Sequence, residues 1–198
     1  MPRLSDQQRE ARREQILTAA LHCVARQGFH KTSMAEVISA SGLSAGAVYG
    51  YFRGKAELIA ALADRSIGMV SPALDEAIAA DPPPSIPEVL RRAAAAIEEL
   101  AAAADVDVTR VATAAWAEAA RDETVRALVA ERITGLREKY AEFLRRRRDL
   151  GELEADVDVD AAAQVMLATM PGFIIQRLVV GDVDSESLAR GAHGLGLR

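Results

Sequence analysis

The spacing of apolar residues constrains the fold more than any other feature of this sequence. They recur at steps of three and four along most of the chain, as Ile16, Leu17, Ala20, Leu21 and Val24 do near its start. This period places them on one face of an α-helix, and no segment has the alternation that is typical of a half-buried strand. Alanine fills 40 of the 198 positions and aromatic residues only 4%, so helices are expected to pack closely through small side chains. The sequence therefore predicts an all-α fold.

Capping residues, glycines and prolines divide the chain into short and long helices. Two Ser-x-x-Glu sequences, at 33–36 and 85–88, have the spacing of a capping box, and Ser44 follows a glycine turn as an N-cap. The prolines of 81–84 must lie in a loop, and Pro72 is expected to kink or end the helix that precedes it. These signals predict helices at about 5–27, 33–41, 44–51, from 55 to beyond 67, 86–104, 108–120, 123–148, 159–180 and 185–194.

The sequence offers neither a disulfide framework nor a metal site. Its one cysteine, Cys23, lies on the apolar side of the first predicted helix, where a buried small side chain is expected. The three histidines lie too far apart for zinc, and the acids of 152–160 lack the spacing of a calcium loop. We expect no metal and no cofactor. The four arginines of 145–148 end a helix, where cations complement the helix dipole, and we expect them to be solvated.

Hydropathy and charge limit the location and the partners of the protein. The longest apolar run, 165–175, has eleven residues and is interrupted by Pro171 and Gly172, whereas a membrane span needs about 20. We expect a cytoplasmic protein without a membrane partner. The net charge is −5, yet residues 1–58 carry +3 and residues 59–198 carry −8. The negative net charge therefore does not exclude an anionic partner, because the basic N-terminal segment can attract one.

Residues 33–52 have the order of a helix-turn-helix. Two short predicted helices flank a turn at 41–43, and a longer amphipathic helix precedes them. In this motif the second short helix enters the major groove of DNA. The sequence predicts a DNA-binding domain over residues 1–58, with the helix-turn-helix at about 33–52, and a second helical domain over residues 59–198.

More specific residues surround this motif, in order and without gaps, over about 14–62. They are Gly28-Phe29, Thr32-Ser33, the run from Ala40 to Tyr49, Tyr51-Phe52 and Lys55-x-Glu57-Leu58. In these residues the chain closely resembles the DNA-binding domain of TetR-family transcriptional regulators. Shorter stretches at 116–122, 151–153 and 171–173 resemble the variable ligand-binding domains of the same family.

The resemblance implies an architecture and a function. It implies a three-helix DNA-binding domain followed by an all-helical domain that binds an effector and forms a homodimer. It also implies a sequence-specific regulator of transcription, a repressor that a small molecule releases from double-stranded operator DNA. Two alternatives stay open: an activator without a ligand, and a helical ligand-binding protein or enzyme that uses a cavity in the second domain. We expect no enzyme, because the sequence has no nucleophile–base pair, metal cluster or glycine-rich phosphate loop.

Candidate phosphate contacts follow from the residue types and from the resemblance. Hydroxyls at helix starts and phenols on the second short helix can bind phosphate oxygens, and Lys55 resembles the family's phosphate-binding lysine. The candidate DNA-binding residues are Lys31, Thr32, Ser33, Ser44, Ala45, Gly46, Ala47, Tyr49, Gly50, Tyr51, Arg53 and Lys55.

Direct reading of bases is expected to be limited. Ala45 and Ala47 offer only methyl groups, and the second short helix has no Arg, Asn or Gln for a bidentate base contact. Specificity is expected from methyl contacts to thymine, from DNA shape or from nearby cations. These cations are Lys31, Arg53 and, in a basic N-terminal arm, Arg3, Arg9, Arg12 and Arg13.

The second domain contains candidate residues for the effector and for the dimer. The resemblance implies an effector pocket, for which we select the aromatic and adaptable side chains Trp116, Tyr140, Phe143 and Met166. An apolar stripe late in the chain needs a partner surface, so the candidate dimer interface is Met170, Phe173, Ile174, Leu178 and Leu188. For both sets the alternative is an ordinary core. The helix that begins at Lys55 is expected to connect effector binding to DNA binding.

Overall fold

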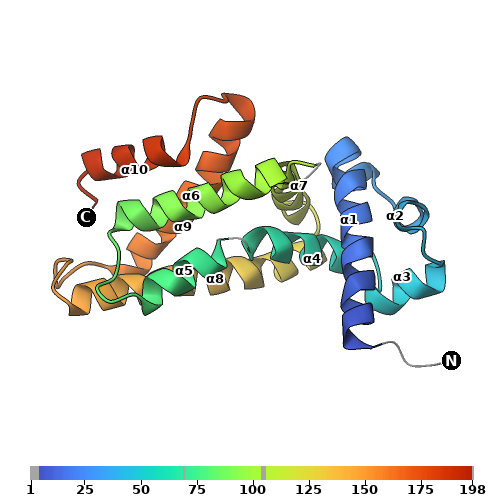
Figure 1. Ribbon diagram of the computed structural model, residues 1–198, viewed down its shortest axis with the longest axis horizontal. Helices are drawn as coiled ribbons and strands as arrows, with labels where there is room; N and C mark the ends of the chain where they lie inside the picture. Colours follow the sequence, from blue (N-terminus) through green and yellow to red (C-terminus); the bar gives the residue numbers. More distant parts are fainter. Residues whose placement is uncertain (1–4, 69, 104–105, 198) are drawn as a thin grey trace. The chain divides into compact units, whose positions relative to one another are not determined.

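A computed structural model describes residues 5–68, 70–103 and 106–197. Within these residues all regular secondary structure is helical, as the sequence predicted (Figure 1). The helices are α1 (Asp6–Lys31), α2 (Met34–Ser41), α3 (Ala45–Tyr51), α4 (Lys55–Ile67), α5 (Ser71–Ala79), α6 (Ile86–Ala103), α7 (Val108–Ala119), α8 (Glu123–Asp149), α9 (Val159–Val179) and α10 (Ser185–Gly194).

The chain divides into two compact units. The head unit contains the described residues of 1–65 and 106–129, and the body unit contains those of 66–105 and 130–198. The sequence predicted one division, after residue 58. The head unit differs from that expectation because it also includes α7, which packs against α1. The buried face of α7 is apolar, with Val108, Val111 and Ala115, and an apolar face alone does not tell which unit it will cover.

Helix α1 contributes a large buried face to the core of the head unit. Ile16, Leu17 and Ala20 are almost completely buried, and Val37 of α2 and Val48 of α3 are as well. The helical path is interrupted at Gly28, whose φ of 77° is costly for any residue with a Cβ. The stop predicted at this glycine is thereby confirmed, although the chain resumes a helical turn as far as Lys31.

Helix α2 is attached to α1 at both of its ends. Gln15 Nε2 donates to the Ser41 carbonyl at 2.7 Å, and Gln27 Nε2 donates to a carboxylate oxygen of Glu36 at 3.0 Å. The first bond satisfies a carbonyl that lacks a partner at the end of the helix, and the second holds its first turn. The orientation of the two short helices is thus set by α1 as well as by the turn between them.

The body unit is built around α6. Helices α5, α9 and α10 all pack against it, and its buried residues include Val89, Leu90 and Ile97. The break expected near Pro72 is confirmed: α4 ends at Ile67, and Pro72 lies in the first turn of α5, where a missing N–H is tolerated. Ser85 Oγ accepts the Glu88 N–H at 3.4 Å, so half of the second predicted capping box is present.

One expectation about α8 needs correction, and α9 is strongly apolar. Arg147 is not solvated: its side chain is 6% exposed and pairs with Glu152 at 2.9 Å. Helix α9 passes through Pro171 without a break, and an 18-residue window of it has a mean hydropathy of 1.3, so by length and composition alone it could cross a membrane. Only 28% of that window is buried, so α9 leaves much apolar surface for a partner.

Candidate nucleic-acid interface

Helix α3 has one buried face and one open face. Val48 is fully buried, whereas Ala45, Gly46 and Gly50 are exposed and the Tyr49 side chain is 48% exposed. Ser44 begins the helix as predicted, and its hydroxyl accepts the Ala47 N–H at 3.3 Å. The open face therefore consists of small residues around one phenol.

A left-handed glycine connects α2 to α3. Gly42 ends α2 with a φ of 68°, a conformation that costs a residue with a Cβ about 1–2 kcal/mol. Gly50 differs, since it lies inside α3, and a Cβ built on it meets no heavy atom within 4 Å. Gly42 is required by the turn, while Gly50 leaves a gap on the open face.

The threonine and serine before α2 have different positions. Thr32 is 4% exposed, and its hydroxyl donates to the Gly28 carbonyl at 2.9 Å. Its predicted phosphate contact needs correction, because this side chain caps α1 and is covered by the head unit. Ser33 is exposed and forms the predicted capping box with Glu36. The hydrogen bond from Gln27, and then those from Ser33, lower the pKa of Glu36, so its carboxylate stays ionised within this box.

Three candidate cations flank the two short helices. Lys31 is exposed at the end of α1, and the Arg53 side chain is 91% exposed beyond α3. Arg53 Nε pairs with Glu57 at 2.8 Å, an exposed contact that a phosphate can replace at little cost. Lys55 is half-buried, and its Nζ lies 3.4 Å from the His30 carbonyl, which orients the ammonium without neutralising it.

The N-terminal arm is only partly available. Arg3 lies outside the described residues. Arg9 and Arg12 are exposed on α1. Arg13 lies 5.8 Å from the centre of the Phe52 ring and 3.7 Å from Glu10, so it supports the head unit.

The geometry can bind phosphates and can read few bases. Hydroxyls, an exposed phenol and cations around α2 and α3 suit phosphate oxygens, which position a protein on DNA without identifying its sequence. The remaining DNA candidates, Ala47 and Tyr51, are half-buried on α3.

The four candidate effector residues fall into different units. Trp116 lies on α7 in the head unit, whereas Tyr140, Phe143 and Met166 lie in the body unit. Tyr140 and Phe143 are fully buried, and Met166 is 4% exposed. Within the described part of the chain, the buried Tyr140 hydroxyl has no hydrogen-bond partner, and burial raises its pKa. Such a group is costly to leave unpaired.

The candidate dimer residues also need revision. Met170, Phe173 and Ile174 are buried within the body unit, because the stripe that the spacing selected is the one that faces the core. The exposed apolar side chains of α9 and of the residues after it are instead Val165, Ile175, Val179 and Val180. Sequence spacing missed them because both sides of α9 are apolar. Leu178 and Leu188 are half-exposed.

A groove of about 380 Å³ lies between α9 and α10. Its walls include Val165, Thr169 and Gln176 of α9 and Leu188 of α10. Phe173 contributes to its floor, so this candidate residue borders the groove although it is buried. No candidate effector residue lines this groove.

Comparison with known proteins assigns the chain to a family. Residues 16–62 match the model of bacterial regulatory proteins of the tetR family, and residues 88–193 match that of the C-terminal region of BetI-type transcriptional repressors. Over 63 residues the chain is 41% identical to the HTH-type transcriptional repressor Rv1474c of Mycobacterium tuberculosis. That match covers 32% of this chain and spans 34% of the relative.

Solved structures share the fold over nearly the whole chain. Salmonella enterica GusR has a TM-score of 0.77 and 24% identity, with 98% of each chain covered. Bacillus subtilis FadR in complex with stearoyl-CoA has a TM-score of 0.74 and 20% identity, covering 93% of this chain and 97% of that one. The helix-turn-helix, the helical body and both family matches agree: this chain belongs to the tetR family of bacterial regulatory proteins.

Proposed function

We propose that this protein is a cytoplasmic, dimeric repressor of transcription that binds operator DNA and is released by a small molecule. The DNA-binding part of this proposal rests on one observation: the open face of α3 lies next to a capped α2 and three cations. Ser33, Ser44, Tyr49 and Lys55 would contact phosphates, and Ala45 and Gly46 would face the bases.

Dimer formation follows from the size of the recognition element. A helix of seven residues covers too few base pairs for useful specificity, so two copies on a palindromic operator are needed. The exposed side chains Val165, Ile175 and Val179, with the groove between α9 and α10, supply an apolar face for a second copy. The recognition helices of the dimer are expected to lie about 34–36 Å apart.

We propose that the effector binds in the body unit. The unpaired Tyr140 hydroxyl, and the burial of Phe143 and Met166 in the same unit, support a ligand that is largely apolar and has one hydrogen-bond acceptor. A structural neighbour, FadR, binds stearoyl-CoA, which is compatible with an apolar ligand. Because coupling is reciprocal, DNA must weaken effector binding by the same factor as the effector weakens DNA binding.

A salt titration of DNA binding tests the central part of this proposal. Random duplexes bound by the protein would be selected and sequenced, and the affinity for the enriched site measured at several salt concentrations. We expect a palindromic site and a steep loss of affinity with salt. No enrichment, together with no measurable affinity at low salt, would reject DNA binding and favour a ligand-binding role for the body unit.

A further inference from the structure

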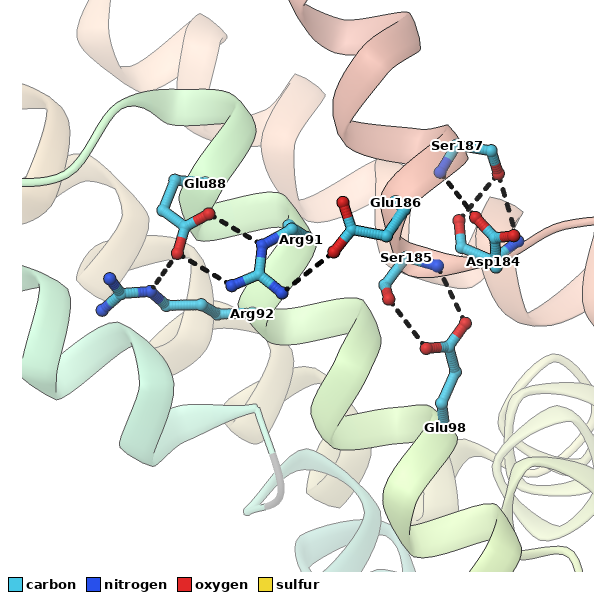
Figure 2. Close-up of polar contacts among 8 residues, drawn as sticks. All are labelled: Glu88, Arg91, Arg92, Glu98, Asp184, Ser185, Glu186 and Ser187. Atoms are coloured by element: carbon cyan, nitrogen blue, oxygen red, sulfur yellow. Dashed lines mark hydrogen bonds and ion pairs between the residues drawn. The ribbon is translucent and has the colours of Figure 1, made fainter.

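Helix α10 is held at its N-terminus by a carboxylate from another helix. Glu98 of α6 accepts the Ser185 backbone N–H on one oxygen and the Ser185 hydroxyl on the other, both at 2.8 Å (Figure 2). Ser185 is 7% exposed and Glu98 is half-buried, so both hydrogen bonds are partly shielded from water. A carboxylate that holds two donors of one residue fixes that residue in direction as well as in distance.

A second contact joins the same two helices at the surface. Arg91 of α6 lies 3.4 Å from Glu186 of α10 and 2.8 Å from Glu88 of its own helix (Figure 2). Arg92 pairs with Glu88 at 2.7 Å. The Glu186 side chain is 64% exposed, and an exposed ion pair contributes little. The Glu98 contact is therefore the stronger of the two.

Helix α10 packs along α6, but few of its own side chains are buried. Among its ten residues only Ser185 and Ala192 are buried, and such small side chains interlock weakly with a neighbouring helix. A helix of this length is also marginal in isolation. Its local capping box, formed by Asp184 and Ser187, stabilises the first turn without attaching the helix to α6. Glu98 adds to this packing an attachment that is fixed in direction at the N-terminus of α10.

The position of α10 in turn shapes one wall of the groove. Leu188, Gly191 and Leu195 line the α10 side of the groove, opposite Val165 and Gln176 of α9. We propose that Glu98 is a positioning residue, which sets α10 against α6 and thereby forms the face through which two copies associate. This inference rests on the proposed dimer, and it adds the residue on which the shape of its interface depends.

Adjacent glutamates provide a matched pair for the test. Glu99 is exposed and, within the described part of the chain, has no hydrogen bond or ion pair. The dimer dissociation constant would be measured by sedimentation, and amide hydrogen exchange would be followed over 185–195. We expect Glu98→Ala to raise the dissociation constant and the exchange rates at least tenfold, and Glu99→Ala to change each by less than twofold.

Ser185→Ala gives a milder second test. It removes the hydroxyl donor and keeps the backbone N–H, so the dissociation constant should rise about threefold while the melting temperature falls by only about 2–4 °C. This variant decides the question if Glu98→Ala does not fold. Unchanged dimerisation and exchange in either folded variant would overturn the positioning role while leaving the dimer intact. A monomeric wild-type protein would reject the proposed dimer and, with it, the role of Glu98 in association.

Discussion

Helices α2 and α10 are both short, and both have a capping box. They differ in how far along the chain the other residues lie that hold them by hydrogen bonds. The box of α2 joins Ser33 to Glu36, Gln27 adds one bond from nine residues before Glu36, and Gln15 adds one to Ser41 from 26 residues before it. The N-terminus of α10 is also held by Glu98, 87 positions earlier. The head unit thus positions its functional helices largely through nearby residues, and the body unit depends on distant ones.

This difference explains why the function of the head unit can be predicted from the sequence and the contacts of the body unit cannot. Capping boxes, turn glycines and a cation at a fixed spacing are local patterns, and a reader of the sequence can recognise them. A carboxylate on α6 that caps α10 has no local pattern, because nothing near Glu98 indicates which helix it will meet. Four experiments can test this contrast, beginning with the largest expected effect.

The first prediction concerns Arg147, a long-range anchor of the body unit. Its guanidinium donates to the Pro84 carbonyl at 2.5 Å, 63 positions earlier, and pairs with Glu152. Arg147→Ala should lower the free energy of unfolding by about 2–4 kcal/mol, because the Pro84 carbonyl and the Glu152 carboxylate each lose a buried partner. Denaturant unfolding measures the change.

Arg145 supplies the control for this prediction. It belongs to the same run of arginines and is exposed, so Arg145→Ala should change the stability by less than about 0.5 kcal/mol. Equal effects of the two substitutions would mean that the run acts as a diffuse charge at a helix end, as the sequence suggested.

The second prediction compares two glycines of the head unit. Gly42→Ala should destabilise the protein by about 1–2 kcal/mol, since alanine resists a φ of 68°. Gly50→Ala should stabilise it by up to about 1 kcal/mol, because it lies inside a helix with open space around its Cβ. Thermal melts of both variants measure the difference. Melts that shift in the same direction would show that backbone conformation does not control this turn.

Particular residues show how much the sequence could predict. The ends of α7, α8, α9 and α10 lie within about one residue of their predicted positions, because caps and apolar periods are local. The Ser33 box, the glycine stop at 28 and the Ser44 cap are confirmed.

The failures of sequence reasoning have one physical cause. The burial of Thr32, the core position of Phe173 and the burial of Arg147 depend on what packs against each side chain. The same holds for Trp116, whose helix joins the head unit. A single sequence gives the apolar face of a helix but not the neighbour that covers it, so such contacts stay invisible until the fold is known.

The third prediction uses pH to test an ion-pair cluster. The hydrogen bond from Arg91, assisted by Arg92, lowers the pKa of Glu88 from 4.5 to about 2. The folded protein therefore favours the ionised form, and the stabilisation is complete above about pH 4.5 and is lost as the pH falls toward 2.

Glu88→Gln should cost about 1 kcal/mol at pH 7, a value reduced for the partial exposure of the group. The difference in the free energy of unfolding between this variant and the wild type should become smaller as the pH falls from 4.5 to 2, as measured by denaturant unfolding. Glu99→Gln, on the same helix and exposed, should show no such dependence. A difference that stays constant with pH would reject the pairing.

The smallest expected effect concerns Lys55 and tests whether the head unit uses its local pattern for phosphate. Lys55→Ala should weaken binding to all duplexes alike, by about two- to fivefold, which is typical of one exposed charge contact. It should also lower the slope of affinity against salt by about one unit, since one fewer counterion is released. Arg137→Ala removes the same charge from an exposed site in the body unit, and the slope should then stay unchanged. If Lys55→Ala changed the preferred sequence at a constant slope, the lysine would read a base, and the head unit would then have a sequence-reading residue outside its recognition helix.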